Sequence, residues 1–404
     1  MKIRIVPSSM IGVKFMYKKR ETFLPYALPL IDEADINEVV ETLKSGWVAK
    51  GPRTVEFEKR FAEYTGAKHA IAMNSATAAL HIALIAAGIK PGDEVITTPI
   101  TFASTVNTIV HVGATPVFAD VDPETYMIDP DKIEEKITEK TKAIVPVHYM
   151  GHACDMDRIR EIAKKHNLFV SEDAAHGIDT YYKGDLIGKK GDCASFSFYA
   201  TKNICTGEGG MLTTNRDDIA EKARVISLHG MSKAAWNRYG KGGSWRYDIE
   251  YPGFKYNMFD IQAAMAKTQM DKLPQMQARR KEIVKAYAEG FKNLDAVTIP
   301  AEAEYTTHSW HLYVLRLNLD KLTIDRDRFI ELMGEANIGT SVHFIPVHLM
   351  SYYKNTYGYK EGDFPVAENY FDRIVSLPLY PKMSDEDVQD VIDAVTHIVN
   401  EHHK

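Results

Sequence analysis

Cysteine is scarce in this chain. The sequence contains three cysteines among 404 residues, and no two of them form a CxxC pair. This spacing argues against a disulfide framework and against a cysteine-only metal or iron–sulfur site, because both need paired or clustered thiols. We therefore expect no metal centre, and a reducing, cytoplasmic location.

Excess basic charge and long apolar runs are lacking as well. The formal net charge of -6 leaves no surplus of lysine and arginine for holding a polyanion. No window approaches the ~20 apolar residues of a membrane span. With 45% hydrophobic and 26% charged residues, the composition is that of an ordinary globular protein. We expect neither nucleic acid nor a membrane as a partner.

Three segments are expected along the chain. The first twenty residues carry six basic side chains and no acidic one. We interpret residues 1–23 as a basic extension, or as sequence upstream of a start at Met10 or Met16, rather than as a targeting signal. A change of pattern near residue 280 divides the rest into a large domain, residues 24–280, and a small C-terminal domain, residues 281–404.

Predicted strands and helices alternate through the first half of the chain. Such alternation implies a mostly parallel sheet covered by helices on both faces, with ligands at the carboxyl ends of the strands. The later part is helical at first and ends in a compact α+β unit. The predicted strands span residues 93–99, 115–122, 141–150, 168–176, 193–202 and 209–215, residues 70–89 combine a strand, a turn and a helix, and further helices span residues 32–44, 54–64, 102–112, 156–166, 276–294 and 385–399.

Lys202 is the first candidate for chemistry. It stands just beyond a predicted strand, among hydroxyl side chains, and a glycine cluster follows it in SFSFYATKNICTGEGG. An amine in such a place loses its charge readily, and a lysine nucleophile needs a lowered pKa. Taken alone, the segment fits an ordinary surface lysine as well.

The segment SEDAAHG supplies a second element. Asp173 ends a predicted strand and could hold the protonated ring nitrogen of a cofactor. A helix cap or a magnesium ligand is the alternative reading of Asp173. His176 could contact the same ring, or it could be a polar residue at the edge of the sheet.

A third element lies where a strand turns into a helix through MNSATAAL. Free backbone N–H groups at a helix start bind phosphate, and the Thr77 hydroxyl adds a donor. A helix cap explains Ser75 or Thr77 equally well. In chain order, a phosphate cradle, an aromatic ring at Phe102, an acid and a lysine together describe one cofactor, pyridoxal 5'-phosphate (PLP).

This order resembles the fold-type I PLP enzymes and, among them, the DegT/DnrJ/EryC1/StrS family of sugar aminotransferases. The resemblance runs from about Leu24 to Val399 and includes SGWVAKGPRTVEFEKRFAEYTGAKHAIAMNSATAALHIAL, GATPVFADVDPETYMIDP, SEDAAHG, FSFYATKN, GEGGML and PGFKYNMFDIQAA. It implies an aspartate-aminotransferase-like α/β fold with a mostly parallel seven-stranded sheet and a smaller α+β C-terminal domain. It also implies a PLP-dependent transaminase that works as a homodimer.

The resemblance assigns a role to each matching residue. Lys202 becomes the lysine that binds PLP as a Schiff base, and Asp173 becomes the partner of the pyridine nitrogen. The other implied cofactor contacts are Ala76, Thr77 and Ser197 at the phosphate, and Phe102 and His176 at the ring.

One segment departs from the family pattern. The family commonly reads GYNYR, with an asparagine that reaches the phosphate of the neighbouring subunit, whereas this chain reads GFKYN. Lys255 stands in place of that asparagine, and Asn257 follows two residues later. A lysine can still meet a phosphate as a point charge, so we expect residues 253–257 to reach the partner's site.

Within the family, PGFKYNMFDI, WHLYVLRL, IGTSVHF and SLPLYPKMSDEDV resemble the subgroup that makes UDP-4-amino-4-deoxy-L-arabinose. This likeness implies that glutamate donates an amino group, 2-oxoglutarate leaves, and a nucleotide-linked 4-keto sugar accepts the group, for cell-surface polysaccharide or lipid A synthesis. Alternatives are another PLP reaction, such as a sugar dehydratase, and a non-catalytic sensor that has kept the fold. Intact Lys202 and Asp173 favour the transaminase. Candidate substrate contacts, each also explicable as a structural residue, are His343, Tyr149, Trp47 and His229.

Overall fold

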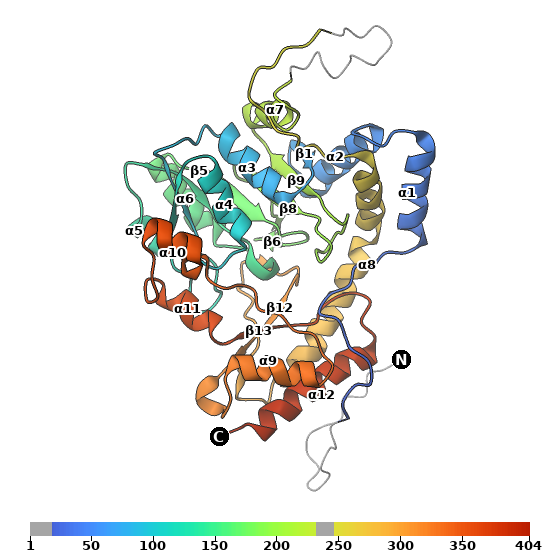
Figure 1. Cartoon of the computed structure of the whole chain (residues 1–404), viewed down its shortest axis with the longest axis vertical. Helices are drawn as coiled ribbons and strands as arrows, with labels where there is room; N and C mark the ends of the chain where they lie inside the picture. Colours follow the sequence, from blue (N-terminus) through green and yellow to red (C-terminus); the bar gives the residue numbers. More distant parts are fainter. Residues whose placement is uncertain (1–17, 232–245) are drawn as a thin grey trace.

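The fold is built around one large sheet. The computed structural model describes residues 18–231 and 246–404, so the predicted basic extension lies outside the described residues up to residue 17. Seven strands form the sheet in the order β1-β9-β8-β5-β4-β2-β3. Of these, β1, β5, β8 and β9 are labelled in Figure 1. In that order the strands are β1 (His69–Met73), β9 (Gly210–Thr214), β8 (Cys193–Ser197), β5 (Phe169–Ala174), β4 (Thr141–Val145), β2 (Glu94–Thr97) and β3 (Thr115–Phe118).

Most neighbouring strands in this sheet are parallel, as predicted. Strands β3, β2, β4, β5 and β8 pair in parallel, whereas β9 is antiparallel to both β8 and β1. Parallel neighbours need crossover connections, and helices supply most of them. The helices of this part are α1 (Glu33–Ser45), α2 (Pro52–Thr65), α3 (Ala76–Ala86), α4 (Ala103–His111), α5 (Pro130–Glu135), α6 (Met156–His166) and α7 (Asp217–Ile226).

Local sequence signals set the ends of helix α1. The Asp32 carboxylate accepts a hydrogen bond of 3.0 Å from the N–H of Ala34, and Asp35 accepts one of 3.0 Å from the N–H of Asp32. Gly46 ends the helix at a φ of 75°, a left-handed conformation that glycine adopts without steric cost. The prediction of a helix at residues 32–44 is therefore confirmed.

Helix α8 connects the large sheet to a second layer. It spans Asp260–Phe291 and packs along α1 (Figure 1). Beyond it, the antiparallel strands β10 (Val297–Thr298), β12 (Tyr313–Leu317) and β13 (Ile374–Leu377) form a sheet, and helices α9 (Arg326–Glu335) and α12 (Asp385–Glu401) pack around it. The predicted boundary at residue 280 falls inside the continuous helix α8, and the division into domains stays a prediction.

Several short elements had no clear signal in the sequence. They are the small sheet of β11 (Thr306–Thr307), β6 (Tyr181–Tyr182) and β7 (Asp185–Leu186), and the helices α10 (Ser351–Tyr357) and α11 (Pro365–Phe371). Each is too short for an apolar period to emerge. In the part of the chain that the structure describes, no helix combines the length and the apolar character that crossing a membrane requires.

Candidate active site

Lys202 lies in the turn that follows β8, at the carboxyl end of the parallel strands. Its backbone N–H donates to the carbonyl of Tyr199 at 2.9 Å. Burial lowers the pKa of the Lys202 amine to about 8, although the charge of Asp173 opposes that shift. A substantial fraction of the amine is therefore neutral near physiological pH, as a lysine nucleophile requires.

Asp173 lies near the end of β5, the strand beside β8. Its Oδ2 accepts a hydrogen bond of 2.7 Å from the Thr105 hydroxyl, and its Oδ1 accepts one of 3.0 Å from the N–H of Ala175. Burial raises the pKa of the Asp173 carboxyl, whereas these hydrogen bonds and the charge of Lys202 act in the opposite direction. A carboxylate has more acceptor positions than these two donors occupy, so Asp173 can also hold a protonated ring nitrogen.

Three histidines surround the lysine, and together with Lys202 and Asp173 we call them the lysine site. The ring centroids of His176 and His311 are 4.3 Å apart, and Nε2 of His311 lies 3.4 Å from Nζ of Lys202. Burial, together with the nearby charge of Lys202, lowers the pKa of His176 and His311 well below the usual value, and that of His343 to about 4. Neutral imidazoles therefore line the site.

His311 is a member of this site that the sequence analysis missed. It lies two residues before β12, in a segment whose apolar pattern indicates a strand. Nothing in that pattern marks the histidine as different from a structural residue. Only the approach of this segment to the turn after β8 brings it against Lys202.

Tyr149 and His343 form one wall of the lysine site. The Tyr149 hydroxyl donates to the backbone carbonyl of His343 and lies 3.4 Å from the Tyr370 hydroxyl. The His343 ring stacks against Tyr26 at 5.5 Å between centroids. Because Tyr149 is only 1% exposed, it supports the wall from behind. A substrate contact of either residue stays a prediction.

The start of helix α3 forms a cradle for an anion. The Ser75 hydroxyl caps the helix by accepting from the N–H of Ala78 at 3.1 Å. The N–H groups of Ala76 and Thr77, in the first helical turn, have no acceptor within the helix. They are therefore available to an anionic ligand, and the helix dipole favours negative charge at this point.

The register of the sheet brings Ser197 to the same place. Met73 on β1 pairs with Gly210 on β9, and Gly210 pairs with Ser197 on β8. A side chain at position 210 would collide with the backbone of Ala76, so glycine allows the close approach of β9 to α3. Backbone N–H groups and hydroxyls thus converge at one edge of the lysine site, a donor set that fits the phosphate of PLP.

Phe102 lies at the rim of the site. It directly precedes α4, the helix that carries Thr105, the hydrogen-bond donor to Asp173. Its ring lies 6.0 Å from that of Phe344, yet 62% of the residue is exposed. An aromatic ring with an open face near Asp173 fits the expectation that Phe102 covers a planar cofactor.

Residues 253–257 lie against the β1–α3 turn of the same chain. The N–H of Asn74 donates to the carbonyl of Tyr256 at 2.7 Å, and the Asn74 side chain donates to the carbonyl of Lys255 at 3.3 Å. Asn257 forms a bridge to Met73, and its buried Oδ1 has no hydrogen-bond partner among the described residues. Asn257 therefore borders its own cradle. The contact of Lys255 with a partner's phosphate stays a prediction.

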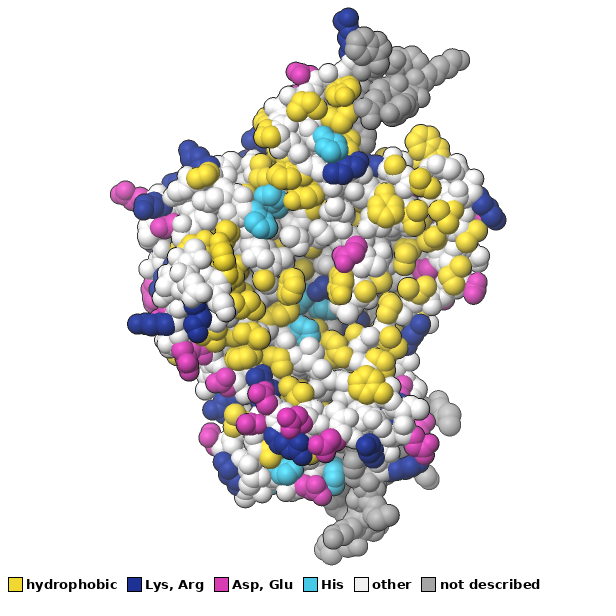
Figure 2. Space-filling view, viewed as in Figure 1, with side chains coloured by type: hydrophobic (Ala, Val, Ile, Leu, Met, Phe, Trp, Pro, Cys, Tyr) yellow, Lys and Arg dark blue, Asp and Glu magenta, His cyan; other side chains and the backbone are white. Residues whose placement is uncertain are grey.

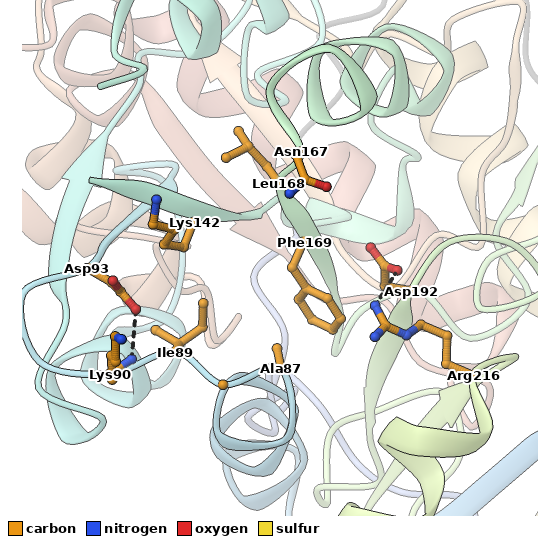
Figure 3. Close-up of a pocket in the computed structure, with 11 residues that line it drawn as sticks. Ala87, Ile89, Lys90, Asp93, Lys142, Asn167, Leu168, Phe169, Asp192 and Arg216 are labelled. Carbon is orange, nitrogen blue, oxygen red and sulfur yellow. Dashed lines mark hydrogen bonds and ion pairs between the residues drawn. The ribbon is translucent and has the colours of Figure 1, made fainter. Parts of the chain in front are cut away.

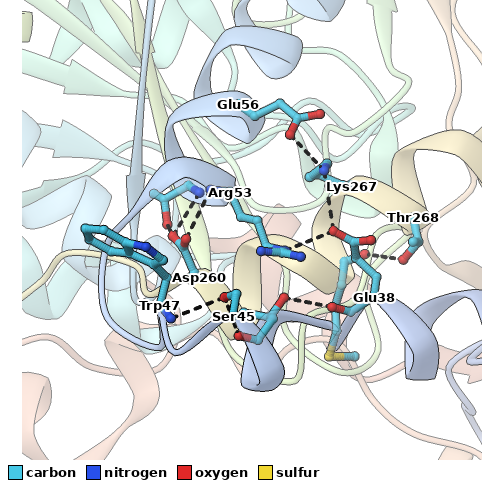
Figure 4. A network of polar contacts seen from close by, with 11 residues as sticks. Glu38, Ser45, Trp47, Arg53, Glu56, Asp260, Lys267 and Thr268 are labelled. Carbon is cyan, nitrogen blue, oxygen red and sulfur yellow. Dashed lines mark hydrogen bonds and ion pairs between the residues drawn. The ribbon is translucent and has the colours of Figure 1, made fainter. Parts of the chain in front are cut away.

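Trp47 and His229 have no hydrogen bond or ring contact with the lysine site in the described residues. Trp47 lies in the loop between α1 and α2 (Figure 4). Asp260, the first residue of α8, holds this loop in place by accepting a hydrogen bond of 2.7 Å from the N–H of Gly51. The backbone N–H of His229 donates to the carbonyl of Phe254, within the 253–257 segment, at 2.8 Å. Their predicted substrate role stays a prediction.

A hollow of about 440 Å³ lies elsewhere on the protein (Figure 3). Lys142 and Phe169, at the starts of β4 and β5, line it together with the ion pair of Arg216 and Asp192. This is the amino end of the parallel strands, opposite the lysine site. Since α/β proteins bind ligands at the carboxyl ends of their strands, we do not assign the reaction to this hollow.

Comparison with known proteins agrees with the geometry. The model of the DegT/DnrJ/EryC1/StrS aminotransferase family matches residues 29–396. The spore coat polysaccharide biosynthesis protein SpsC of Bacillus subtilis is 58% identical over 385 residues, which cover 95% of this chain and 99% of SpsC.

Solved structures show the same fold. The PMP form of the putative sugar aminotransferase Spr1654 from Streptococcus pneumoniae superposes with a TM-score of 0.89 at 37% identity, covering 94% of this chain and 99% of that one. PseC of Helicobacter pylori, an aminotransferase involved in the biosynthesis of pseudoaminic acid, has a TM-score of 0.87 at 29% identity, covering 94% and 100% of the two chains.

These findings confirm the predicted fold, family and cofactor. The narrower likeness to the subgroup that makes UDP-4-amino-4-deoxy-L-arabinose stays a prediction. A half-buried lysine of lowered pKa, a buried acid near it and an anion cradle are the parts that a PLP enzyme needs. The chain belongs to the DegT/DnrJ/EryC1/StrS aminotransferase family and is a PLP-dependent sugar aminotransferase.

Proposed function

We propose that this aminotransferase moves an amino group from glutamate to the C4 carbonyl of a nucleotide-linked keto sugar. The product serves the synthesis of a cell-surface polysaccharide or a lipid A sugar. The observation that carries the proposal is the pairing of the half-buried Lys202, whose amine has a lowered pKa, with the buried Asp173 at the carboxyl end of the sheet, beside an anion cradle. The similarity to SpsC, a spore coat polysaccharide biosynthesis protein, supports the polysaccharide role.

Each residue of the site has one task in this proposal. When bound, PLP supplies an electron sink that carries the amino group from donor to acceptor. The Lys202 amine is partly neutral near pH 8. Its Nζ accepts a proton from the substrate carbon and later donates a proton back. Asp173 stabilises a positive charge on the ring nitrogen. This electrostatic stabilisation is preorganised, because the carboxylate is in position before the reaction. The backbone N–H groups of Ala76 and Thr77 and the Ser197 hydroxyl would hold the phosphate.

Ring contacts and substrate contacts complete the assignment. Phe102 and His176 would contact the cofactor ring, and neutral His176 would add no positive charge there. We assign Tyr149 and His343 to the wall of the sugar pocket. Trp47 and His229 are exposed, and we assign them to contacts with the nucleotide part of a long substrate or with a second subunit.

We also propose that the active unit is a homodimer. Ile36, Val40, Leu43 and Trp47 recur at helical spacing along α1 and its loop, and all four are exposed. Figure 2 shows hydrophobic side chains gathered on the part of the surface where Figure 1 places α1 and α2. A contiguous apolar surface of this kind is typical of an interface. Covering it with a second copy would place the subunit boundary near the loop of Trp47.

Free cysteines support a cytoplasmic location in this proposal. Cys154, Cys193 and Cys205 are all buried and unpaired with one another. Burial raises the pKa of the Cys205 thiol, so the reactive thiolate is disfavoured. Such thiols suit a reducing compartment, where nucleotide-linked sugars are also made.

A half-reaction screen tests the function. Glutamate should convert the enzyme to its pyridoxamine form, and each nucleotide-linked keto sugar is then mixed with that form. We expect the absorbance of the aldehyde form to return only with a 4-keto sugar that carries a nucleotide. Recovery with a 3-keto sugar, or with a sugar lacking the nucleotide, would contradict the proposed substrate.

Sedimentation tests the homodimer. Leu43→Glu places a charge in the apolar stripe and should shift the protein from dimer to monomer. Glu41→Gln, on another face of the same helix, is the matched control and should leave the dimer intact. A wild-type protein that is active as a monomer would contradict this part of the proposal.

A further inference from the structure

A chain of hydrogen bonds runs from helix α8 to the amine of Lys202. Gln277 on α8 contacts Asn203, Asn203 contacts His311, and His311 contacts Lys202. The separations are 3.1 Å between Gln277 Oε1 and Asn203 Nδ2, 3.2 Å between Asn203 Oδ1 and His311 Nδ1, and 3.4 Å between His311 Nε2 and Lys202 Nζ. Three separate parts of the fold contribute to this chain.

The backbone carbonyl of Ser309 determines which atoms donate and which accept in this chain of hydrogen bonds. A carbonyl oxygen only accepts, so both amides must turn an NH2 group toward it. Nε2 of Gln277 lies 2.9 Å from this oxygen, and Nδ2 of Asn203 lies 3.2 Å from it. The Asp179 carboxylate, 3.3 Å from Nε2 of Gln277, enforces the same orientation. Oδ1 of Asn203 is therefore the atom that faces His311.

This oxygen decides the tautomer of His311. Because Oδ1 of Asn203 can only accept, Nδ1 of His311 must carry the proton. Burial first, then the neighbouring His176 and Lys202, lowers the pKa of His311 well below its usual value, so the ring carries one proton only. Nε2 of His311 therefore carries no proton, and its lone pair points at Nζ of Lys202.

We propose that His311 is a tautomer-locked acceptor that holds the Lys202 amine whenever the amine is released from the cofactor, and that Asn203 and Gln277 are positioning residues that set the lock. The inference rests on the role proposed above for Lys202. A neutral acceptor fixes the direction of the amine and leaves it free to lose a proton. A second carboxylate would instead keep the amine protonated. With one N–H engaged by His311, the rest of the Lys202 amine is free to transfer protons at the substrate carbon.

The charged and titratable groups around Lys202 are consistent with this role. Asp173 faces the amine from β5, His176 from the loop after β5, and His343 from the segment before α10. Arg280 on α8 lies behind His311 and donates to its backbone carbonyl at 3.4 Å. Apart from Asp173, these neighbours disfavour added positive charge, so His311 stays a neutral acceptor.

Nitrogen NMR of histidine tests the lock directly. The PLP enzyme is made with 15N-labelled histidine and converted by glutamate to its pyridoxamine form, in which Lys202 is free. We expect the His311 signal, identified by its loss in His311→Gln, to show a protonated Nδ1 and a bare Nε2, unchanged between about pH 5 and 8. A proton on Nε2 would overturn the inference, whatever the behaviour of any variant.

Variants test the effect on Lys202. His311→Leu removes the acceptor and should lower kcat about 100-fold, with KM for glutamate nearly unchanged. His311→Gln is the matched variant, because its amide oxygen can reach toward Nζ, and it should recover part of the loss. Asn203→Leu should yield both tautomers in the NMR spectrum and a lower kcat.

Bound PLP, measured by absorbance, shows that each variant is folded. Wild-type kcat in His311→Leu, or an unchanged tautomer in Asn203→Leu, would refute the inference. The role of Lys202 itself is judged separately. If Lys202→Ala stays active, the proposed function is wrong, whereas an inactive Lys202→Ala with the opposite His311 tautomer refutes the lock alone.

Discussion

Thr105 and Asp173 are joined by a hydrogen bond of 2.7 Å, in which the Thr105 hydroxyl donates to Oδ2 of the carboxylate. The Thr101 hydroxyl lies 2.7 Å from that of Thr105. Two hydrogen-bonded hydroxyl groups therefore connect the start of α4 to the buried Asp173 carboxylate. Because Thr105 is already a donor to Asp173, Thr101 must donate to Thr105. Helix α4 therefore helps to keep Asp173 charged against a burial that favours its neutral form.

Removing this donor should weaken catalysis. Thr105→Val keeps the volume but leaves Oδ2 of Asp173 without its hydroxyl donor, and a hydrogen bond to a charged group contributes about 1.5–3 kcal/mol. We expect kcat to fall about tenfold or more in steady-state assays. Thr108→Val is the control, since the Thr108 hydroxyl donates only to the carbonyl of Thr105, at 3.0 Å. Equal losses in the two variants would show that packing, not the carboxylate, is affected.

Lys202→Ala should bind PLP and have no transaminase activity. No other side chain that we assign to the site carries an amine beside Asp173. Peptide mapping after borohydride reduction of the wild-type enzyme should find the cofactor on Lys202. Label on any other lysine would disprove the assignment.

Asp173→Asn should keep the fold and lose several orders of magnitude in rate. A neutral amide cannot hold the proton on the ring nitrogen, and one misplaced charge contact costs about 3 kcal/mol or more. The rate of each half-reaction, followed by absorbance, measures the loss. Near-normal turnover would mean that Asp173 has a different task.

The lowered pKa of Lys202 makes the stability of the cofactor-free protein depend on pH. The amine titrates near 10.5 when the chain is unfolded and near about 8 when it is folded. Between these values the unfolded chain binds more protons, so the free energy of unfolding rises with pH across this window. The full change amounts to about 3 kcal/mol.

Urea denaturation at about pH 8 and about pH 10 measures this rise. Lys202→Met removes the titrating group and keeps an apolar side chain of similar length. The pH dependence in this window should therefore be smaller in the variant by the amount that Lys202 contributes. An identical pH dependence in both proteins would show that the amine is not buried.

Lys255→Ala should lose PLP faster on dialysis and still bind it at Lys202. A cation near a doubly charged phosphate strengthens retention, and salt screens that attraction. The difference between wild type and variant should therefore shrink as salt is added. Lys59→Ala is the control, because the Lys59 side chain is exposed and lies 3.8 Å from Glu63. Retention like that of wild type at low salt would refute the contact across the subunits.

Much of the fold can be read from the sequence because its signals are local. The helix predicted at residues 156–166 coincides with α6, and the alternation of strands and helices indicates the parallel sheet. Capping residues and apolar periods act over a few neighbouring positions, so one sequence suffices to find them. The short strands β6, β7 and β11 have too few residues to carry a period, and they form only by pairing with one another.

Within the site, the sequence by itself determined the chemical parts: a lysine after one strand, an acid at the end of another, and small residues at a helix start. Their order along the chain was enough to identify PLP. Only the tertiary structure decided that His311, 109 residues away from Lys202, lies against its amine, and that Asn203 and Gln277 orient that histidine. Hydrogen-bond direction depends on atoms from distant segments meeting within about 3 Å, and no local pattern in a single sequence encodes that meeting.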